Sequence, residues 1–188
     1  MRNSKLISQE ILFNKYHKKF VVDHLKLSDG TKGFWAYVSA PSGTIIVALD
    51  KDKNLILVRQ YRYTQKGFTY EDPAGAVDEN ENFLGTAKRE LFEESGYRSE
   101  TFIDLGRYHT LSNETDHRCQ IFLATNCEYI SAPTLDPYAE KYSEMTTELH
   151  PFIEIYNSLG KPDSLIKDTE HVAAIFLTHR YLSENNLL

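Results

Sequence analysis

A run of acidic residues on one predicted helix is the feature that most constrains this chain. Residues 83–95 have a helical composition and are followed by Gly96, a residue type that often ends a helix. On that helix Glu90 and Glu94 lie one turn apart on one face, with Glu93 beside them. Like charges at this spacing destabilise an isolated helix by roughly 0.2–0.5 kcal/mol. A divalent hard cation bound by converging carboxylates would reverse that effect, whereas charge spacing alone is equally typical of a solvated acidic face.

The wider spacing of residues around this helix overturns the solvated-face alternative. Fixed Gly, Glu and Arg positions follow in the order Gly75, five residues, Glu81, seven residues, Arg89-Glu90-Leu91, one residue, Glu93-Glu94, one residue, Gly96. Seven fixed residues at about 6% background frequency each coincide by chance at roughly one in 10⁸ per starting position. The pattern resembles the Nudix box at all of these positions. It departs from the box at Tyr97, where the family favours an aliphatic residue.

This resemblance implies a Nudix α/β/α sandwich with a mixed β-sheet, and a loop–helix–loop that binds Mg²⁺ or Mn²⁺. Glu90 and Glu94 would be metal ligands, and Glu93 would be a ligand or a close neighbour. Arg89 would hold one of these carboxylates in place, and Glu81 would support the same network. Metal ions between the carboxylates and a diphosphate neutralise charge that grows in the transition state and help to activate water.

Two flanking segments resemble one branch of the family, the pyrophosphatases of ADP-ribose and nucleoside diphosphate sugars. One strand ends in Val58-Arg59-Gln60-Tyr61-Arg62, and Glu71-Asp72-Pro73-Ala74-Gly75 leads directly into the box. By this resemblance the Ala74 carbonyl is a further metal ligand, and Arg59 or Arg62 contacts phosphate, for which a planar guanidinium is well suited. Glu71 would help to hold the substrate or an arginine, and Asp72 stands where the branch usually has leucine. The alternative for both arginines is an ordinary surface pair.

Hydrolysis also needs a base near the attacking water. In the branch this base is often a glutamate on a loop after the last core strands, and Glu140 matches that loop best. Glu144 is the second candidate, and Glu93 could serve instead. The loop at residues 109–117 lacks the Pro-Gly element that is usual in ADP-ribose enzymes, so the branch is better defined than the substrate.

The remaining elements interleave strands and helices without a repeating βα unit, which favours an α/β (α+β) fold with a mixed sheet covered by helices. The break Ala40-Pro41-Ser42-Gly43 separates an N-terminal antiparallel β extension, residues 1–40, from a Nudix domain, residues 41–188. Members of the branch use such an extension to dimerise, so a homodimer is expected. Strands are predicted within 20–27, 34–38, 44–49, 55–63, 101–110 and 118–126, short strands within 64–82, and further helices near 151–159 and 164–183.

Composition excludes several other classes of protein. The 188 residues carry a formal net charge of −6, and general nucleic-acid binding instead uses a basic face. No window of 18 apolar residues is present and no signal-peptide core follows the start, so we expect no membrane span and a cytoplasmic location. The two cysteines, Cys119 and Cys127, match no zinc-binding spacing and are expected to be reduced, buried thiols.

The sequence therefore predicts Mg²⁺-dependent hydrolysis of ADP-ribose or a related nucleoside diphosphate sugar, giving a nucleoside monophosphate and a sugar phosphate. One alternative is a Nudix hydrolase of another substrate, such as a GDP-sugar or a dinucleoside polyphosphate. A second alternative is a Nudix module that binds a nucleotide without cleaving it. Such modules normally lose box carboxylates, and this chain keeps all of them. The preferred base and sugar, the physiological metal and the phosphorus attacked are left open.

Overall fold

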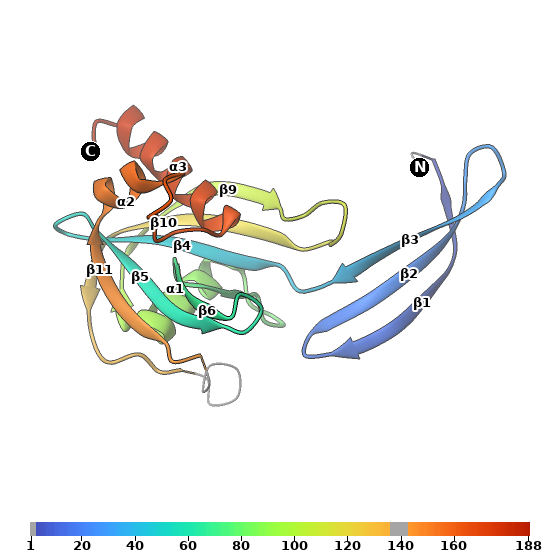
Figure 1. The fold of residues 1–188 in the computed structure, drawn as a ribbon, viewed down its shortest axis with the longest axis horizontal. Helices are drawn as coiled ribbons and strands as arrows, with labels where there is room; N and C mark the ends of the chain where they lie inside the picture. Colours follow the sequence, from blue (N-terminus) through green and yellow to red (C-terminus); the bar gives the residue numbers. More distant parts are fainter. Residues whose placement is uncertain (1–2, 136–142) are drawn as a thin grey trace. The chain divides into compact units, whose positions relative to one another are not determined.

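The computed structural model describes residues 3–135 and 143–188 and divides the chain into two compact units (Figure 1). One unit contains the chain up to Ser42 together with Tyr108–Cys119, and the other contains Gly43–Arg107 and Gln120–Leu188. The division between Ser42 and Gly43 lies two residues after the boundary predicted at 40/41. The segment Tyr108–Cys119, which the sequence interpretation assigned to the second domain, groups with the first unit.

The smaller unit is built on a three-stranded antiparallel sheet, β1 (Lys5–Lys15), β2 (Lys18–Lys26) and β3 (Lys32–Ser39). Tyr16 and His17 join β1 to β2 with φ of 53° and 60°, and a two-residue type I′ turn requires positive φ at both positions. The sequence predicted β structure over the first forty residues, but it defined no separate strand corresponding to β1. β1 is exposed along its whole length.

The larger unit contains an eight-stranded sheet in which β11, β5, β4, β10 and β8 are neighbours in that order. Three further strands pair at its sides, β6 with β5, β7 with β4 and β9 with β10. The strands are β4 (Gly43–Asp50), β5 (Asn54–Arg62), β6 (Gly67–Glu71), β7 (Ala74–Ala76), β8 (Tyr97–Arg98), β9 (Thr101–His109), β10 (Arg118–Tyr129) and β11 (Thr146–Pro151). Three helices accompany them, α1 (Phe83–Ser95), α2 (Phe152–Ser158) and α3 (Thr169–Glu184).

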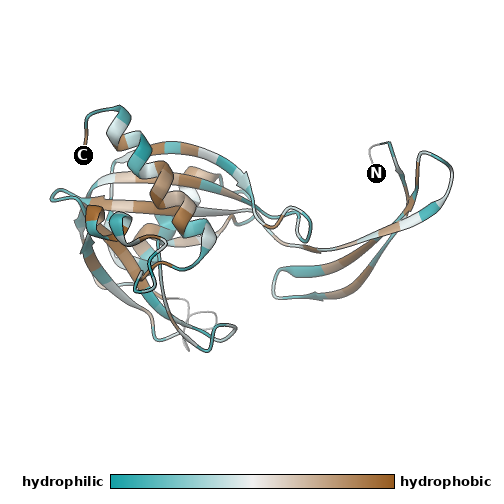
Figure 2. Cartoon of the chain, turned by 45° about the horizontal axis from the view of Figure 1, so that its top comes forward, coloured by the Kyte–Doolittle hydropathy of each residue, from teal (hydrophilic) through white to brown (hydrophobic). Residues whose placement is uncertain are grey.

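The sheet is covered on both faces, as the burial of β4 indicates. Ile46 and Ala48 form one core cluster with Ala87 and Leu91 of α1. Because side chains alternate along a strand, the neighbouring β4 residues point to the other face, where α3 packs against β4, and they are also buried: Ile45, Val47 and Leu49. The central strands are accordingly hydrophobic in Figure 2. These observations confirm the predicted α/β/α sandwich.

Two sequence-based expectations about the larger unit need correction. β11 was not predicted, and it pairs antiparallel with β5 from Thr146 to Pro151. α3 begins at Thr169 rather than near 164, because the Asp168 side chain accepts a hydrogen bond from the Glu170 N–H at 3.0 Å and caps the helix there. Both cysteines are free and buried, as expected. Within the described part of the chain, no helix is long and apolar enough to cross a membrane.

Candidate active site

Helix α1 carries the acidic residues, and local sequence determines where it begins and ends. At its start the Asn82 side chain accepts a hydrogen bond from the Gly85 N–H at 2.8 Å. At its end Gly96 has a φ of 75°, and its N–H donates to the Phe92 carbonyl at 2.8 Å. A Cβ at Gly96 would overlap the Ser131 carbonyl oxygen, so only glycine fits there. The helix therefore presents its glutamates in a defined register.

Glu90 and Glu94 both face the backbone of β7. Glu94 Oε2 accepts a hydrogen bond from the Ala74 N–H at 2.9 Å. The Glu90 carboxylate fills the space beside Gly75, where an added Cβ would overlap Oε1 and Cδ and would lie 2.7 Å from Oε2. The two glutamates are only 8% and 6% exposed. Two residues of the predicted metal site thus meet the Ala74–Gly75 backbone, although the sequence separates them from it by fifteen or more residues.

Arg89 connects the remaining acidic residues of the box. Its Nε and Nη2 donate to Glu81 at 3.0–3.3 Å, and its Nη1 donates to Glu90 at 2.7 Å and to Glu93 at 3.0 Å. Nη2 also donates to the Ala76 carbonyl at 3.2 Å. The hydrogen bonds with Glu81 raise the pKa of Arg89 and hold the pKa of Glu81 below its ordinary value. Arg89 and Glu81 are therefore a charged pair at neutral pH.

The donor chemistry at this place fits a hard divalent cation. Glu90, Glu93 and Glu94 supply carboxylate oxygens, which Mg²⁺ and Mn²⁺ prefer, and Gly75 leaves the space in which the Glu90 carboxylate lies against the backbone. Among residues 3–135 and 143–188, no group of three Asp, Glu, His or Cys side chains is placed so that it could hold a metal ion. Arg89 Nη1 bonds to Oε1 of Glu90 and to Oε2 of Glu93, and each carboxylate has a second oxygen that this nitrogen does not bond.

The two predicted phosphate-binding arginines have different surroundings. Arg62 donates from Nε to Glu71 Oε1 at 2.8 Å and from Nη2 to Glu71 Oε2 at 2.5 Å, a bidentate pair. The Arg59 guanidinium instead lies over the Phe68 ring, 3.6 Å from its centroid. The Glu71 side chain is 9% exposed and the Arg62 side chain 48%. Glu71 thus holds an arginine, the second of its two predicted roles, and Arg62 reaches solvent beside it.

Comparison with known proteins identifies the family to which the chain belongs. A model of the NUDIX domain matches residues 40–177, most of the chain and all of the site described above. The chain belongs to the Nudix family. The match begins within one residue of the domain start predicted at residue 41, and the predicted family is confirmed.

Several relatives are similar over part of their length. A CMP-5'-(N-acetyl-N-hydroxy-3-aminopropyl)phosphonate hydrolase of Streptomyces rubellomurinus is 32% identical over 98 residues, 52% of this chain and 48% of that protein. An ADP-ribose pyrophosphatase of Bacillus subtilis is 28% identical over 120 residues, 64% of this chain and 65% of that protein. The chain thus spans about half to two thirds of these relatives. A solved structure of an ADP compounds hydrolase matches with a TM-score of 0.82 and 20% identity, over 98% of this chain and 97% of that one, and shows the same fold.

Sequence reasoning missed one residue beside the Nudix box, His171 on α3. Its Nδ1 lies 3.1 Å from Asp72 Oδ2, and its Nε2 lies 3.8 Å from Glu71 Oε2. Asp72 and His171 are 1% and 6% exposed. The available signal was Asp72 itself, because a charged residue in the place of a usual leucine needs a buried partner.

The predicted general bases are only partly described. Glu140 lies outside the described residues, so its role stays a prediction. Glu144 is exposed and has a φ of 49°, and the carbonyl before it, that of Ser143, accepts a hydrogen bond from the Tyr61 N–H at 2.6 Å. Glu144 is therefore the residue next to Ser143, which contacts β5, the strand that carries Arg59 and Arg62.

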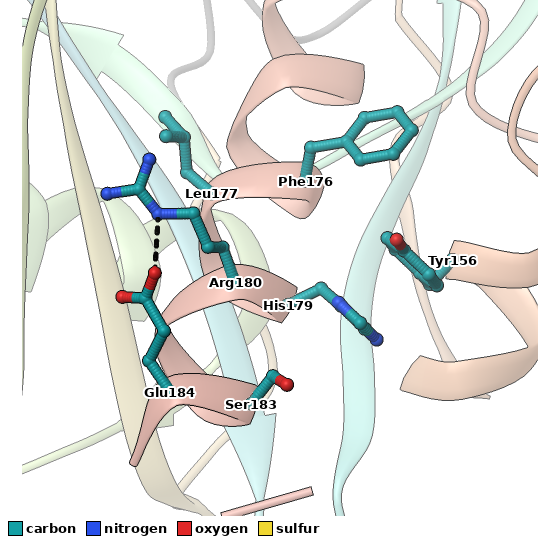
Figure 3. Close-up of a pocket in the computed structure, with 7 residues that line it drawn as sticks. All are labelled: Tyr156, Phe176, Leu177, His179, Arg180, Ser183 and Glu184. Carbon is teal, nitrogen blue, oxygen red and sulfur yellow. Dashed lines mark ion pairs between the residues drawn. The ribbon is translucent and has the colours of Figure 1, made fainter.

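A separate hollow between α2 and α3 contains none of the predicted site residues (Figure 3). In it Tyr156 of α2 stacks on His179 of α3, with ring centroids 3.6 Å apart and an interplanar angle of 4°. Arg180 and Glu184 form an ion pair of 3.3 Å on its rim. Tyr156 also meets Phe176 edge to face, and Phe176 is 47% exposed.

Proposed function

We propose that this chain is a Nudix pyrophosphatase that hydrolyses the diphosphate bond of ADP-ribose or a related nucleoside diphosphate sugar. The products would be a nucleoside monophosphate and a sugar phosphate. The observation that carries the proposal is the meeting of Glu90 and Glu94 at the Ala74–Gly75 backbone, in a chain that keeps every charged position of the Nudix box.

The proposed metal site consists of Glu90, Glu94 and the Ala74 carbonyl, with Glu93 as a ligand or close neighbour. A divalent cation, Mg²⁺ or Mn²⁺, would supply charge neutralisation and a lowered pKa for bound water. The chain's own residues prepare that site. Gly75 gives the Glu90 carboxylate its space, and Arg89 orients the Glu90 and Glu93 carboxylates through one nitrogen. Without a cation, an acidic site of this kind would repel a diphosphate.

The substrate's phosphates are proposed to bind Arg62, which Glu71 holds in a bidentate pair at the end of β5. Within the described residues Arg62 Nη1 makes no hydrogen bond, so its two N–H groups are available to phosphate oxygens. Arg59 is the second candidate, with its guanidinium on the Phe68 ring. The water is proposed to lose its proton to Glu140, with Glu144 or Glu93 as alternatives.

The names of the relatives support a nucleotide substrate with a diphosphate or phosphonate linkage. The Bacillus subtilis protein is an ADP-ribose pyrophosphatase, and the Streptomyces protein is a hydrolase of a CMP-linked phosphonate. Their nucleosides differ, so a GDP-sugar stays a second candidate substrate for this chain. A module that binds without cleaving is disfavoured, because nothing in the box is lost.

The N-terminal unit supports a further proposal, that the protein is a homodimer assembled through residues 1–40. Its strands leave large apolar side chains 40–66% exposed, among them Leu6, Ile7, Ile11, Leu12, Phe13, Phe20, Phe34 and Trp35. A partner sheet would bury this surface and cover the exposed strand β1. We propose a cytoplasmic location, which suits two free cysteines.

The decisive experiment incubates the purified protein with Mg²⁺ and a panel of ADP-ribose, GDP-mannose, UDP-glucose, a dinucleoside polyphosphate and coenzyme A. Ion-exchange chromatography then separates the products. We expect a nucleoside monophosphate and a sugar phosphate from at least one sugar nucleotide, with ADP-ribose preferred. Tight binding of a sugar nucleotide without any product would instead identify a binding module.

A further inference from the structure

Arg62 is the exposed end of a chain of polar and charged side chains that runs into the protein. The Glu71 carboxylate beneath it accepts four hydrogen bonds, from Arg62 Nε and Nη2, from the Thr69 hydroxyl at 2.6 Å and from Gln60 Nε2 at 3.2 Å. Such a carboxylate has little freedom to rotate. The orientation of the Arg62 guanidinium is therefore only as well defined as the position of Glu71.

Glu71 in turn has the imidazole of His171 on its buried side. His171 Nε2 lies 3.8 Å from Glu71 Oε2, the same oxygen that accepts from Arg62 Nη2. The other ring nitrogen, Nδ1, lies 3.1 Å from Asp72 Oδ2. Side-chain exposure falls along this chain from 48% for Arg62 to 9% for Glu71, 7% for His171 and 0% for Asp72.

Burial raises the pKa of the Asp72 carboxyl, whereas the pKa values of its neighbours His171 and Glu71 shift in the direction that favours their charged forms. Burial by itself would lower the pKa of His171, but the Asp72 carboxylate raises it above its ordinary value. Burial by itself would raise the pKa of Glu71, but the hydrogen bonds from Arg62 and Thr69 hold it below its ordinary value. The Asp72 backbone N–H donates to His171 Nδ1 at 3.1 Å, and Asp72 Oδ2 lies 3.1 Å from the same nitrogen, so Asp72 holds the ring with Nε2 facing Glu71.

We propose that His171 and Asp72 are positioning residues, which hold Arg62, through the Glu71 carboxylate, in the orientation that binds the diphosphate of the substrate. The inference rests on the proposed function and deepens it, since it adds α3 to the substrate site. Neither residue touches substrate. Their effect is to place a polar ring nitrogen beneath Glu71, so that this carboxylate stays buried in one position.

The physical reason lies in the cost of burying a carboxylate beside an apolar side chain. With leucine at positions 72 and 171, Glu71 Oε2 would face hydrocarbon on its inner side. The carboxylate would then move toward solvent and carry the bidentate arginine with it. One of these two leucines is already known from the family resemblance, because leucine is usual at the position of Asp72.

The test uses the paired variant Asp72→Leu/His171→Leu, because replacing a buried ion pair with apolar residues of similar size is often neutral for stability. We expect an unfolding temperature close to that of the wild-type protein. We expect KM for ADP-ribose to rise about tenfold with kcat changed less than threefold, as for a lost charge-assisted contact to substrate. The matched control is His179→Leu, which removes a second histidine of α3 that stacks on Tyr156 instead, and it should leave KM unchanged.

A double-mutant cycle with Arg62→Ala separates positioning from a merely structural role. If His171 and Asp72 act through Arg62, the paired substitution will change KM by less than twofold once Arg62 is absent. A tenfold rise in both backgrounds would overturn the proposal. So would a paired variant with wild-type KM.

A second readout does not need catalysis. Hydrogen exchange of the Arg62 Nε–H, followed by ¹⁵N NMR and assigned with Arg62→Ala, should be at least tenfold faster in the paired variant (roughly the loss of one protected hydrogen bond). Unchanged exchange would overturn the positioning role even in an active enzyme. Failure of the wild-type protein to cleave any sugar nucleotide would contradict the proposed function, while the exchange rates would still decide whether α3 holds Arg62.

Discussion

The contact between Glu90 and Gly75 leads to a prediction about a single methyl group, the change Gly75→Ala. A Cβ at position 75 would overlap Oε1 and Cδ of the Glu90 carboxylate. Even Oε2, the farthest of the three atoms, would lie at 2.7 Å, whereas ordinary contact begins at 3.4 Å, so the carboxylate must move by about 1 Å or more. Glu90 is buried and bonded to Arg89 at 2.7 Å, so this movement cannot be confined to a free side chain.

The expected effect is large on turnover and small on stability. A misplacement of about 1 Å in a catalytic group costs roughly 10²-fold in rate, so kcat with saturating Mg²⁺ should fall by about that factor. Weakening the Arg89–Glu90 bond costs about 1.5–3 kcal/mol, and the reduced freedom of the unfolded chain returns about 0.4–1 kcal/mol. The net loss of about 0.5–2.6 kcal/mol corresponds to a fall of about 1–10 °C in unfolding temperature.

The assay measures kcat by product chromatography and the unfolding temperature by circular dichroism. The control is Gly85→Ala, the same change near the start of α1, where the new Cβ would make only an ordinary contact with Glu81 Cγ at 3.4 Å. That variant should keep its activity and gain stability, because alanine is a better helix former. If Gly75→Ala were as active as Gly85→Ala, the argument that Glu90 needs this space would be refuted.

Three further predictions concern other parts of the molecule. Light scattering at micromolar concentration should report a homodimer that depends on residues 1–40, and a monomer would contradict the proposed interface. Glu140→Gln should lower kcat sharply with KM nearly unchanged, and Glu144→Gln should lower kcat less than about tenfold. If Glu144→Gln is the less active variant, Glu144 is the base, and if both variants are active, the base lies in the Nudix box. Burial raises the pKa of the Cys127 thiol to about 12, so iodoacetamide at pH 8 should modify it only after unfolding, and mass spectrometry showing its alkylation in the folded protein would contradict that burial.

The sequence predicted the Nudix helix closely because its signals are local. The Gly96 terminus and the charge spacing just before it lie within a few residues of one another, and α1 occupies the predicted range 83–95. The α/β/α sandwich was implied by the resemblance to the Nudix family, and the mixed sheet was predicted from strands whose hydrophobic character is strong, such as β4 and β5. β11 was missed because its sequence, Thr-Thr-Glu-Leu-His-Pro, has little apolar character, and its pairing with β5 is what makes it a strand.

Long-range pairs in the candidate site escaped prediction for a different reason. Asp72 and His171 are 99 residues apart, and no periodicity in a single sequence connects them. The different surroundings of Arg59 and Arg62 could not be predicted for the same reason. Arg59 contacts Phe68 and Arg62 contacts Glu71, and both partners lie on the adjacent strand β6. The Glu90–Gly75 contact could have been predicted, because both residues belong to the box motif. The distance between them could be obtained only from the structure.

The central claim is that the carboxylates of α1 carry the chemistry, and the turnover of Glu94→Gln tests it most directly. The amide keeps the size of the side chain and can still accept a hydrogen bond from the Ala74 N–H, so the fold should be retained. It cannot replace a charged metal ligand. With ADP-ribose and saturating Mg²⁺, the account predicts a loss of at least about two orders of magnitude in kcat, and near-normal turnover would contradict it.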